Sequence, residues 1–352
     1  MEQRIEKPLS VPTEQISSLY RFSKRLDDVN WSARYKPNRP FLEGLVPHMQ
    51  DFLDRNIRKI TYDNSSLRAV VGISGGLDSS VSATLVADTI TQAQDKGTIQ
   101  NSSLVLIAFQ GMSEEDLESA RKFAELMGSK YTNIPIDYQE RDLSKLLRDL
   151  DSFTEDLIFS TRKPKVYSGE LTSRVITPII MEYADRIGHC AIDSTNGTEY
   201  ILGEIVIGAE AECAPIADFY KSQVYDLADL ISVPKFVVNR PPINSTWGHD
   251  KVATYFAEKP EGLTPREAYQ LLDPVLYYLF ERRYQPSTVA KRLGHSLEFV
   301  SSLATRIKDQ DHRRDIPFFV VNDRFKKYPR AVKSRTNEEM QGFMKDSLAI
   351  AG

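Results

Sequence analysis

Predicted strands and amphipathic helices alternate through the first half of this chain. Apolar, β-favouring residues at 69–73 predict a strand, and apolar residues at helical spacing over 81–90 predict a helix directly after it. Residues 103–109 predict a second strand followed by a helix over 117–127, and residues 131–136 predict a third strand. Strands that alternate with helices form a parallel sheet with helices on both faces. The pattern therefore predicts an α/β fold with a doubly wound parallel sheet, Rossmann-like in its layering.

The middle of the chain has a less regular pattern. Residues 139–157 predict an acidic helix, and residues 160–169 predict a basic loop. A further helix is predicted over 171–187, with Arg174 near its start. A cation in the first turn opposes the helix dipole, so an anionic partner is expected there, with a solvated surface arginine as the alternative. Residues 189–192 predict another short strand.

The C-terminal third favours helices. A broad apolar face over 265–283 predicts a helix, and residues 288–296 followed by 297–307 resemble a helix-turn-helix. A DNA-reading module is therefore an alternative function from a different class. The charge of this segment is only modestly positive, which favours packing over DNA binding.

Changes in composition divide the chain into three expected regions. These are an N-terminal arm at 1–40, a main domain at 41–320 whose part 262–320 is a helical C-terminal extension, and a polar tail at 321–352. The main domain is predicted to begin with an amphipathic helix over 41–60.

The composition narrows the functional class. A formal charge of −4 gives no general attraction to nucleic acid or to anionic membranes. No apolar run approaches the roughly 20 residues of a membrane span, and the first residues are too polar for a signal peptide. The two cysteines, Cys190 and Cys213, form neither a disulfide framework nor a metal-binding spacing. We therefore expect a cytoplasmic protein with no nucleic-acid or membrane partner.

A glycine-rich turn joins the first strand to its helix. Residues 74–80 read SGGLDSS. Paired glycines let a ligand approach the backbone, and the unpaired N–H groups and dipole at a helix start favour an anion. The lysine of the common phosphate-binding loop is missing, and Asp78 beside a phosphate makes sense if it holds Mg²⁺. An ordinary glycine turn is the alternative, but so many specified positions favour a phosphate site.

Two later segments carry candidate partners for this loop. A second polar turn, residues 193–199, reads DSTNGTE after the short strand, and Glu199 could share a metal with Asp78 if the two strand ends adjoin. An ordinary first-turn glutamate is the alternative. Lys221 begins another amphipathic helix that runs to Leu230. It could meet phosphates as a point charge, or it could be a solvated lysine at a helix end.

The turn at 74–80 resembles the S-G-G-x-D-S phosphate loop of the N-type ATP pyrophosphatases, which cleave ATP between its α and β phosphates. Further segments in a fixed order resemble the NAD synthetase family, the ammonia-dependent type, over about 41–320. The segments are 113–116 (SEED), 173–174 (SR), 194–200 (STNGTEY), 215–225, 240–242 (RPP) and 312–314 (HRR) followed by Pro317.

The resemblance implies a role for each candidate residue. The ATP-binding set would be Gly72, Ser74, Gly75, Gly76, Asp78, Ser79, Ser80, Ser194 and Lys221. Within it, Asp78, Ser79 and Lys221 would be catalytic. Asp78 and Glu199 would hold Mg²⁺. The acceptor dinucleotide would lie against Arg174, Glu212, His312 and Arg313.

The family's reaction adenylates the nicotinate carboxylate of deamido-NAD, releases pyrophosphate, and lets ammonia displace AMP to give NAD⁺. The physical logic fits, because a carboxylate is a poor electrophile until AMP makes it a mixed anhydride, and Mg²⁺ with Lys221 would stabilise charge on the departing pyrophosphate. About forty residues before the main domain are too few for a glutaminase, so we expect free ammonia, or an amine donor, as the nitrogen source. The resemblance also implies a homodimer.

The acceptor side departs from the family pattern. Where the family usually has FTKYGDG, residues 205–210 read IVIGAE, and the loop is about two residues shorter without its substrate-binding lysine. Glu204, Glu210 and Glu212 make the region acidic. A divergent ligase that adenylates another carboxylate is therefore an alternative. A sulfur-transfer enzyme that uses Cys213 and a non-catalytic nucleotide-binding protein are two more.

Overall fold

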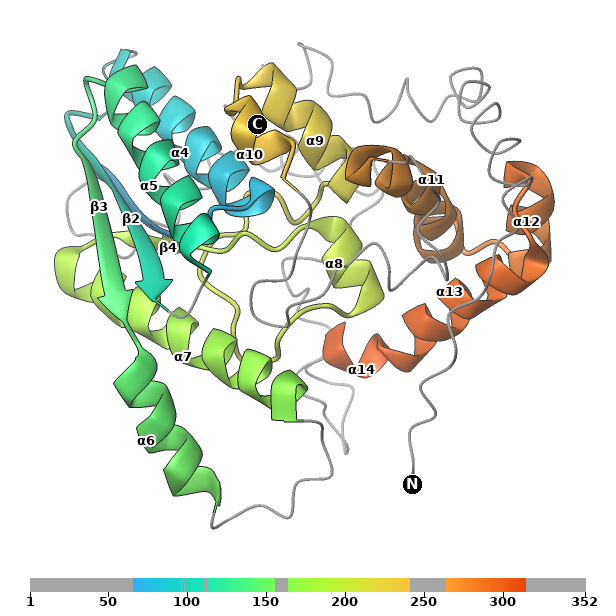
Figure 1. Cartoon of the computed structure of the whole chain (residues 1–352). Helices are drawn as coiled ribbons and strands as arrows, with labels where there is room; N and C mark the ends of the chain where they lie inside the picture. Colours follow the sequence, from blue (N-terminus) through green and yellow to red (C-terminus); the bar gives the residue numbers. More distant parts are fainter. Residues whose placement is uncertain are drawn as a thin grey trace, which may run out of the picture. The chain divides into compact units, whose positions relative to one another are not determined.

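The computed structural model describes residues 66–95, 97, 99–110, 113–155, 164–240 and 264–314 (Figure 1). Apart from the last residue of α14, all of them belong to one compact unit, Met1–Arg313. The arm at 1–40, the helix expected over 41–60 and the tail at 321–352 lie outside the described residues.

A parallel sheet forms the centre of this unit. Its strands lie in the order β3-β2-β1-β4, and β1 pairs with β2 from Ser66↔Asn101 to Gly72↔Ile107. The strands are β1 (Ser66–Gly72), β2 (Asn101–Gln110), β3 (Ile136–Asp142) and β4 (Cys190–Ile192). The α/β fold with a doubly wound parallel sheet is confirmed.

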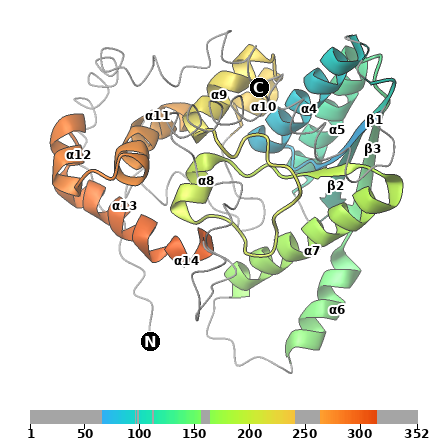
Figure 2. The same cartoon turned by 180° about the vertical axis from the view of Figure 1, so that it is seen from behind.

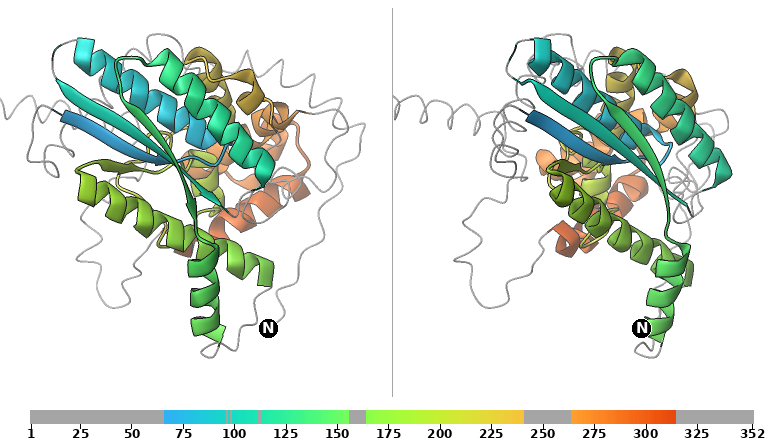
Figure 3. Two further views of the ribbon diagram at one scale, coloured as in Figure 1. Left: turned by 60° about the vertical axis from the view of Figure 1, so that its left-hand side comes forward. Right: turned by 90° about the vertical axis from the view of Figure 1, so that its left-hand side faces the viewer.

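Both faces of the sheet are buried, as the near-continuous apolar runs of β1 and β2 require. Val71 and Leu106 face the helices α4 (Leu77–Asp95) and α5 (Glu114–Lys130). Val70 and Ile107, one position away, face α7 (Pro164–Ile187) on the other side. Figure 3 shows α4 and α5 on one side of the strands and α7 on the other.

The direction of winding changes between β1 and β4. From β1 the chain runs outward through β2 to β3, and it returns through α7 to place β4 on the other side of β1. In open α/β sheets ligands bind at such a switch point, beyond the carboxyl ends of the strands. The glycine turn after β1 and the polar turn after β4 both lie at this edge.

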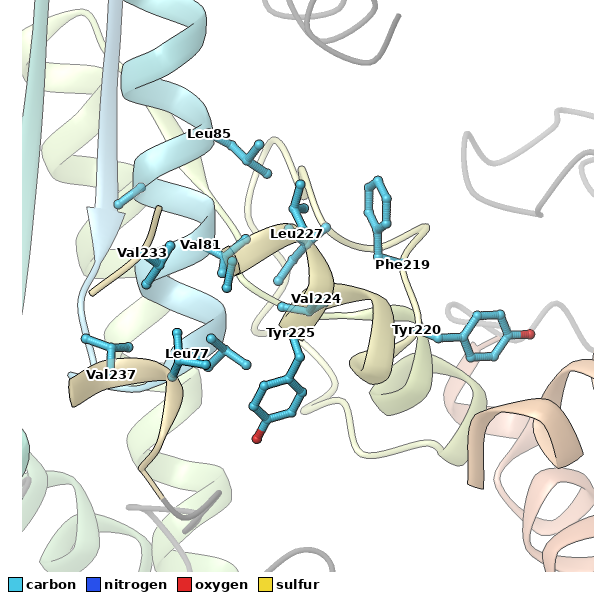
Figure 4. Close-up of a cluster of buried hydrophobic side chains, with 14 of the residues drawn as sticks. Leu77, Val81, Leu85, Phe219, Tyr220, Val224, Tyr225, Leu227, Val233 and Val237 are labelled. Carbon is cyan, nitrogen blue, oxygen red and sulfur yellow. The ribbon is translucent and has the colours of Figure 1, made fainter. Parts of the chain in front are cut away.

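The helix α4 is buried on nearly all sides. Val81 and Leu85 are almost fully buried, which stabilises the fold by roughly 1.5–3 kcal/mol for each side chain. In Figure 4 these side chains face Val224 and Leu227 of α9 (Lys221–Leu230). The contact fixes the axis of α9 beside the start of α4.

Among the remaining helices, α6 lies between β3 and α7 in the sequence, and the others follow β4 (Figure 2). They are α6 (Ser144–Glu155), α8 (Gly197–Leu202), α10 (Lys235–Val238), α11 (Pro265–Leu276), the π-helix η2 (Tyr277–Glu281), α12 (Pro286–Leu293), α13 (Leu297–Asp309) and α14 (Asp311–Arg314). The helix pair expected after residue 288 is present, with Gly294 ending α12 at φ +71° and Ser296 capping α13. Among the described residues, no helix has the length and apolar character needed to span a bilayer.

The third strand lies later than predicted. Residues 131–135 are not a strand: Tyr131 ends α5, and β3 begins at Ile136. Tyr131 and Ile134 are buried because they close the end of α5 against the core, where the Tyr131 hydroxyl donates to Asp88 Oδ1 at 2.5 Å. The apolar pattern therefore marked burial and not a strand. The true edge strand is polar, which made it resemble the start of the acidic helix expected from residue 139.

The long helix α7 also begins earlier than predicted. The basic loop expected at 160–169 is helical from Pro164 onward, and the rest of it lies outside the described residues. Arg174 consequently lies ten positions inside α7. The first-turn argument for an anionic partner of Arg174 was wrong, because the dipole acts only in the terminal turns.

Candidate functional site

The glycine turn folds onto its own hydroxyl groups. Ser79 Oγ accepts a hydrogen bond from Ser74 N at 3.2 Å and lies 3.0 Å from Ser74 Oγ, and Ser80 Oγ donates to Gly76 O at 2.9 Å. Ser79 and Ser80 are buried, whereas Ser74 is exposed. The buried serines shape the loop, and the exposed Ser74 hydroxyl accepts from Gly76 N at 3.3 Å.

The helix α5 and Arg240, which lies two residues beyond α10, contact this loop from outside. Ser119 Oγ donates to Gly75 O at 2.9 Å, and Arg240 Nη1 donates to the same oxygen at 3.2 Å. Arg240 Nη2 also lies 2.7 Å from Asp116 Oδ1. Gly75 has φ +71°, and a Cβ there would collide with the carbonyl oxygen of Asp116. The loop thus needs glycine for both its backbone angle and its close contact.

The polar turn after β4 reaches the same place. Asn196 caps α8, and its Nδ2 donates to Asp78 Oδ1 at 3.2 Å. Glu199 closes the capping box by accepting from Asn196 N at 3.2 Å. Asn196 therefore connects the two acids predicted to share a metal. Ser194 lies half-buried in the same turn.

An ion pair joins this turn and the loop to α9. Lys221 Nζ lies against Asp78 Oδ2, and the two side chains are only 6% and 21% exposed. Asp78 is thus held through one oxygen by Asn196 and through the other by Lys221. The structure brings together the predicted residues Asp78, Lys221 and the loop at the switch point.

A buried carboxylate that the sequence did not single out supports this pair. Asp273 of α11 is fully buried and accepts hydrogen bonds from Thr198 Oγ1 at 2.8 Å and Ser222 N at 2.7 Å. Loss of hydration raises the pKa of Asp273 to about 6, although these hydrogen bonds and the charge of Lys221 oppose the rise. Asp116, Ser119 and Arg240 also lay outside the predicted set of site residues.

The predicted acceptor residues gather around a different segment, the loop at 204–213. Arg174 Nε donates to Ile207 O at 2.9 Å, and Arg313 Nη1 donates to Ile205 O at 3.0 Å. Glu212 Oε2 accepts from Ala191 N, in β4, at 2.7 Å. The side chain of the fourth predicted residue, at position 312, lies outside the described residues.

The thiol proposed for sulfur transfer is poorly suited to that chemistry. Cys213 is 5% exposed, and burial raises the pKa of its thiol to about 12. A thiolate is the reactive form of cysteine. Cys213 therefore has the character of a packing residue beside β4.

A parallel sheet whose switch point carries a glycine loop, an aspartate and a buried lysine is typical of α/β proteins that bind phosphate-bearing ligands. A family model described as NAD synthase matches residues 45–317. The chain belongs to the NAD synthase family, a family of AMP-forming carbon–nitrogen ligases, which confirms the resemblance noted in the sequence.

Individual relatives agree with this assignment. The NH(3)-dependent NAD(+) synthetase of Sulfurisphaera tokodaii is 25% identical over 268 residues, 75% of this chain and 85% of the relative. That of Pyrococcus furiosus is 26% identical over 281 residues, 78% and 93% respectively. The solved NH3-dependent NAD synthetase of Campylobacter jejuni shares the fold, with a TM-score of 0.55 at 18% identity, over 79% of this chain and 98% of that one. A structure of NMN synthetase from Francisella tularensis gives 0.54 at 19% identity, over 80% and 98%.

Replacing Gly75 with alanine should lower the free energy of unfolding by about 2–5 kcal/mol, because the left-handed backbone costs about 1–2 kcal/mol and overpacking adds about 1–3 kcal/mol. The matched control is Gly97→Ala. Gly97 has a similar φ of +66° but nothing within 4 Å of its Cβ position. Denaturant unfolding of both variants tests the expectation, and equal losses would mean that the contact with Asp116 is unimportant.

The buried carboxyl of Asp273 should make stability fall as the pH rises. Its folded-state pKa of about 6 exceeds the ordinary value of 3.8, so the folded protein binds the proton more tightly between these values. From pH 4 to pH 7, the wild type should lose up to about 3 kcal/mol of stability relative to Asp273→Asn. Urea unfolding of both proteins across this range measures the difference.

The control for this titration is Asp142→Asn. The pKa of Asp142 is lowered by its hydrogen bond with Ser144, so its contribution has the opposite sign and is lost as the pH falls. A pH-independent difference between wild type and Asp273→Asn would contradict the expected titration.

Proposed function

We propose that this chain is an ATP-dependent amide ligase that converts deamido-NAD, ATP and ammonia to NAD⁺, AMP and pyrophosphate. The observation that carries the proposal is the ion pair between the buried Lys221 and the partly buried Asp78, beside the glycine loop at the sheet's switch point. In the reaction, the acceptor carboxylate bonds to the α-phosphorus as the bond to pyrophosphate breaks. Ammonia then attacks the acyl carbon, and AMP leaves with the bonding electrons.

The chain's own groups suit the first of these steps. The N–H groups at the start of α4 and the exposed hydroxyl of Ser74 can bind phosphate oxygens. The ammonium of Lys221 can stabilise the charge that develops on the departing pyrophosphate. To do so it must shift from Asp78 toward the phosphates, and Asp78 then becomes available for another cation.

The donor set around Asp78 fits Mg²⁺ bound largely through ATP. This ion commonly uses one or two carboxylates together with substrate phosphates. Among the described residues, no group of three or more His, Cys, Asp or Glu side chains could hold a metal ion. We infer that Asp78 and Glu199 hold the ion, which would neutralise phosphate charge.

We also propose, from the resemblance to the family, that the enzyme is a cytoplasmic homodimer. The acceptor is the part of the proposal with a second candidate. The short loop at 204–213 lacks the family's lysine, and its acid Glu204 is paired with Arg306 at 3.1 Å. A smaller carboxylate such as the mononucleotide precursor of NMN is therefore the alternative acceptor, and Arg174 and Arg313 are the proposed contacts for either one.

The test is an assay of the full chain with Mg²⁺-ATP, ammonium and each acceptor, with the amide product identified by mass. We expect NAD⁺ from deamido-NAD. We also expect Asp78→Asn and Lys221→Met to lower kcat by about 100-fold or more, the usual scale for lost transition-state electrostatics.

The matched control is Lys235→Met. Lys235 also begins a helix and pairs with an aspartate, Asp229, but its side chain is 71% exposed. Its kinetics should match those of the wild type. If the wild type binds ATP but forms only the mononucleotide amide, the mononucleotide replaces deamido-NAD as the acceptor. If neither acceptor yields an amide, the proposal is refuted.

A further inference from the structure

The helix α9 begins at Lys221. The backbone N–H of Tyr220, the residue before it, donates to Gln223 Oε1 at 2.9 Å, and this bond leaves the N–H groups of Lys221 and Ser222 to acceptors outside the helix. The first N–H groups of any helix lack partners within it. A Ser, Thr, Asp or Asn at this position usually supplies one.

Two other helices supply the missing acceptors. Lys221 N donates to Thr198 Oγ1, in α8, at 2.8 Å, and Ser222 N donates to Asp273 Oδ2, in α11, at 2.7 Å. The Thr198 hydroxyl donates in turn to Asp273 Oδ1 at 2.8 Å. A continuous chain of hydrogen bonds therefore runs from the carboxylate of Asp273 to the backbone of Lys221.

Every residue in this chain of hydrogen bonds is buried. Asp273 is 0% exposed, Thr198 2% and Lys221 5%. Burying a carboxylate costs free energy unless hydrogen bonds and charges compensate it. The start of α9 supplies both, through its N–H groups and its positive dipole end.

The apolar contacts of α9 do not by themselves fix the position of Lys221, and the hydrogen bonds with Thr198 and Asp273 supply that constraint. Figure 4 shows Val224 and Leu227 facing α4, which fixes the axis of the helix. Hydrophobic contact is not directional, so it sets the position of the first residue along and around that axis only loosely. Tyr220, whose hydroxyl donates to Glu281 Oε1 at 2.5 Å, points away from α4 (Figure 4). The hydrogen bonds from Thr198 and Asp273 act at Lys221 itself and its neighbour.

We propose that Asp273, acting through Thr198 and the start of α9, is a positioning residue that sets where Lys221 presents its ammonium group to ATP. The inference rests on the proposed role of Lys221 in ATP binding. A misplacement of about 1 Å can cost about 100-fold in rate. The helical C-terminal part of the protein thereby contributes to the ATP site through the hydrogen bonds that Asp273 accepts from Thr198 and Ser222.

The first experiment compares two substitutions of Thr198. Thr198→Val keeps the shape but removes the hydroxyl, so it should lower kcat by about 10- to 100-fold and leave the acceptor KM within about twofold. Thr198→Ser keeps the hydroxyl and should restore most of the rate. A merely structural role would lower the melting temperature and the active fraction but would leave kcat per ATP-binding site, counted by calorimetry, unchanged. Equal rates for the two variants would overturn the proposal.

The second experiment is a double-mutant cycle with Lys221. Asp273→Asn keeps the volume and a hydrogen-bonding group but removes the charge, and it should weaken ATP binding about tenfold in the wild-type background. In a Lys221→Met background it should change ATP affinity less than twofold, because there is no ammonium left to position. Equal effects in both backgrounds would show that Asp273 does not act through Lys221. If Asp273→Asn does not fold, Thr198→Val replaces it in the same double-mutant cycle with Lys221→Met.

ATP affinity, measured by calorimetry with the full chain, separates this inference from the proposed function. If deamido-NAD gives no amide but ATP still binds, the acceptor assignment fails and the cycle still tests Asp273. If Lys221→Met leaves ATP affinity and kcat unchanged, the proposed role of Lys221 fails and the positioning role is overturned with it.

Discussion

The contact between the Lys221 ammonium and the Asp78 carboxylate is the interaction on which the rest of the site depends. Lys221 is buried and Asp78 is partly buried, so loss of either partner would leave the other charge poorly solvated. The two residues are 143 positions apart in the sequence. The parallel crossovers that place β4 beside β1, and the packing of α9 on α4, are the features that bring them together.

The same pair explains how an anionic ligand can be bound without a large excess of positive charge. In the absence of a nucleotide, Lys221 and Asp78 neutralise each other. A polyphosphate offers the ammonium more negative charge than one carboxylate does, and the released carboxylate can then accept a metal ion. In the proposed reaction, the site therefore exchanges partners instead of exposing a bare charge, which would keep its polar groups satisfied with and without ligand.

The sequence predicted those parts of the structure that local chemistry determines. The strand, glycine turn and helix around residues 74–80 follow from backbone needs, and Lys221 does begin its helix. Residues that act through distant contacts could not be found in this way. Asp273 left one signal, an acid within an otherwise apolar face, whereas Arg240 had no local signal of its contact with Gly75. The polar edge strand β3 was missed because edge strands need not be apolar.

Arginine side chains hold the altered acceptor loop at 204–213. Arg174 and Arg313, from helices far apart in the sequence, donate to carbonyl oxygens of this loop only two residues apart, and Arg306 pairs with Glu204. The added acidity of the loop is thus partly neutralised by Arg306, whereas Arg174 and Arg313, which the resemblance assigned to the acceptor, bond to neutral carbonyl oxygens. An acceptor phosphate must compete with these carbonyl oxygens for the same guanidinium groups. If the proposed acceptor contacts hold, selectivity on the acceptor side depends on how readily the loop gives up Arg174 and Arg313, whereas the proposed ATP side uses an ion pair that is already formed.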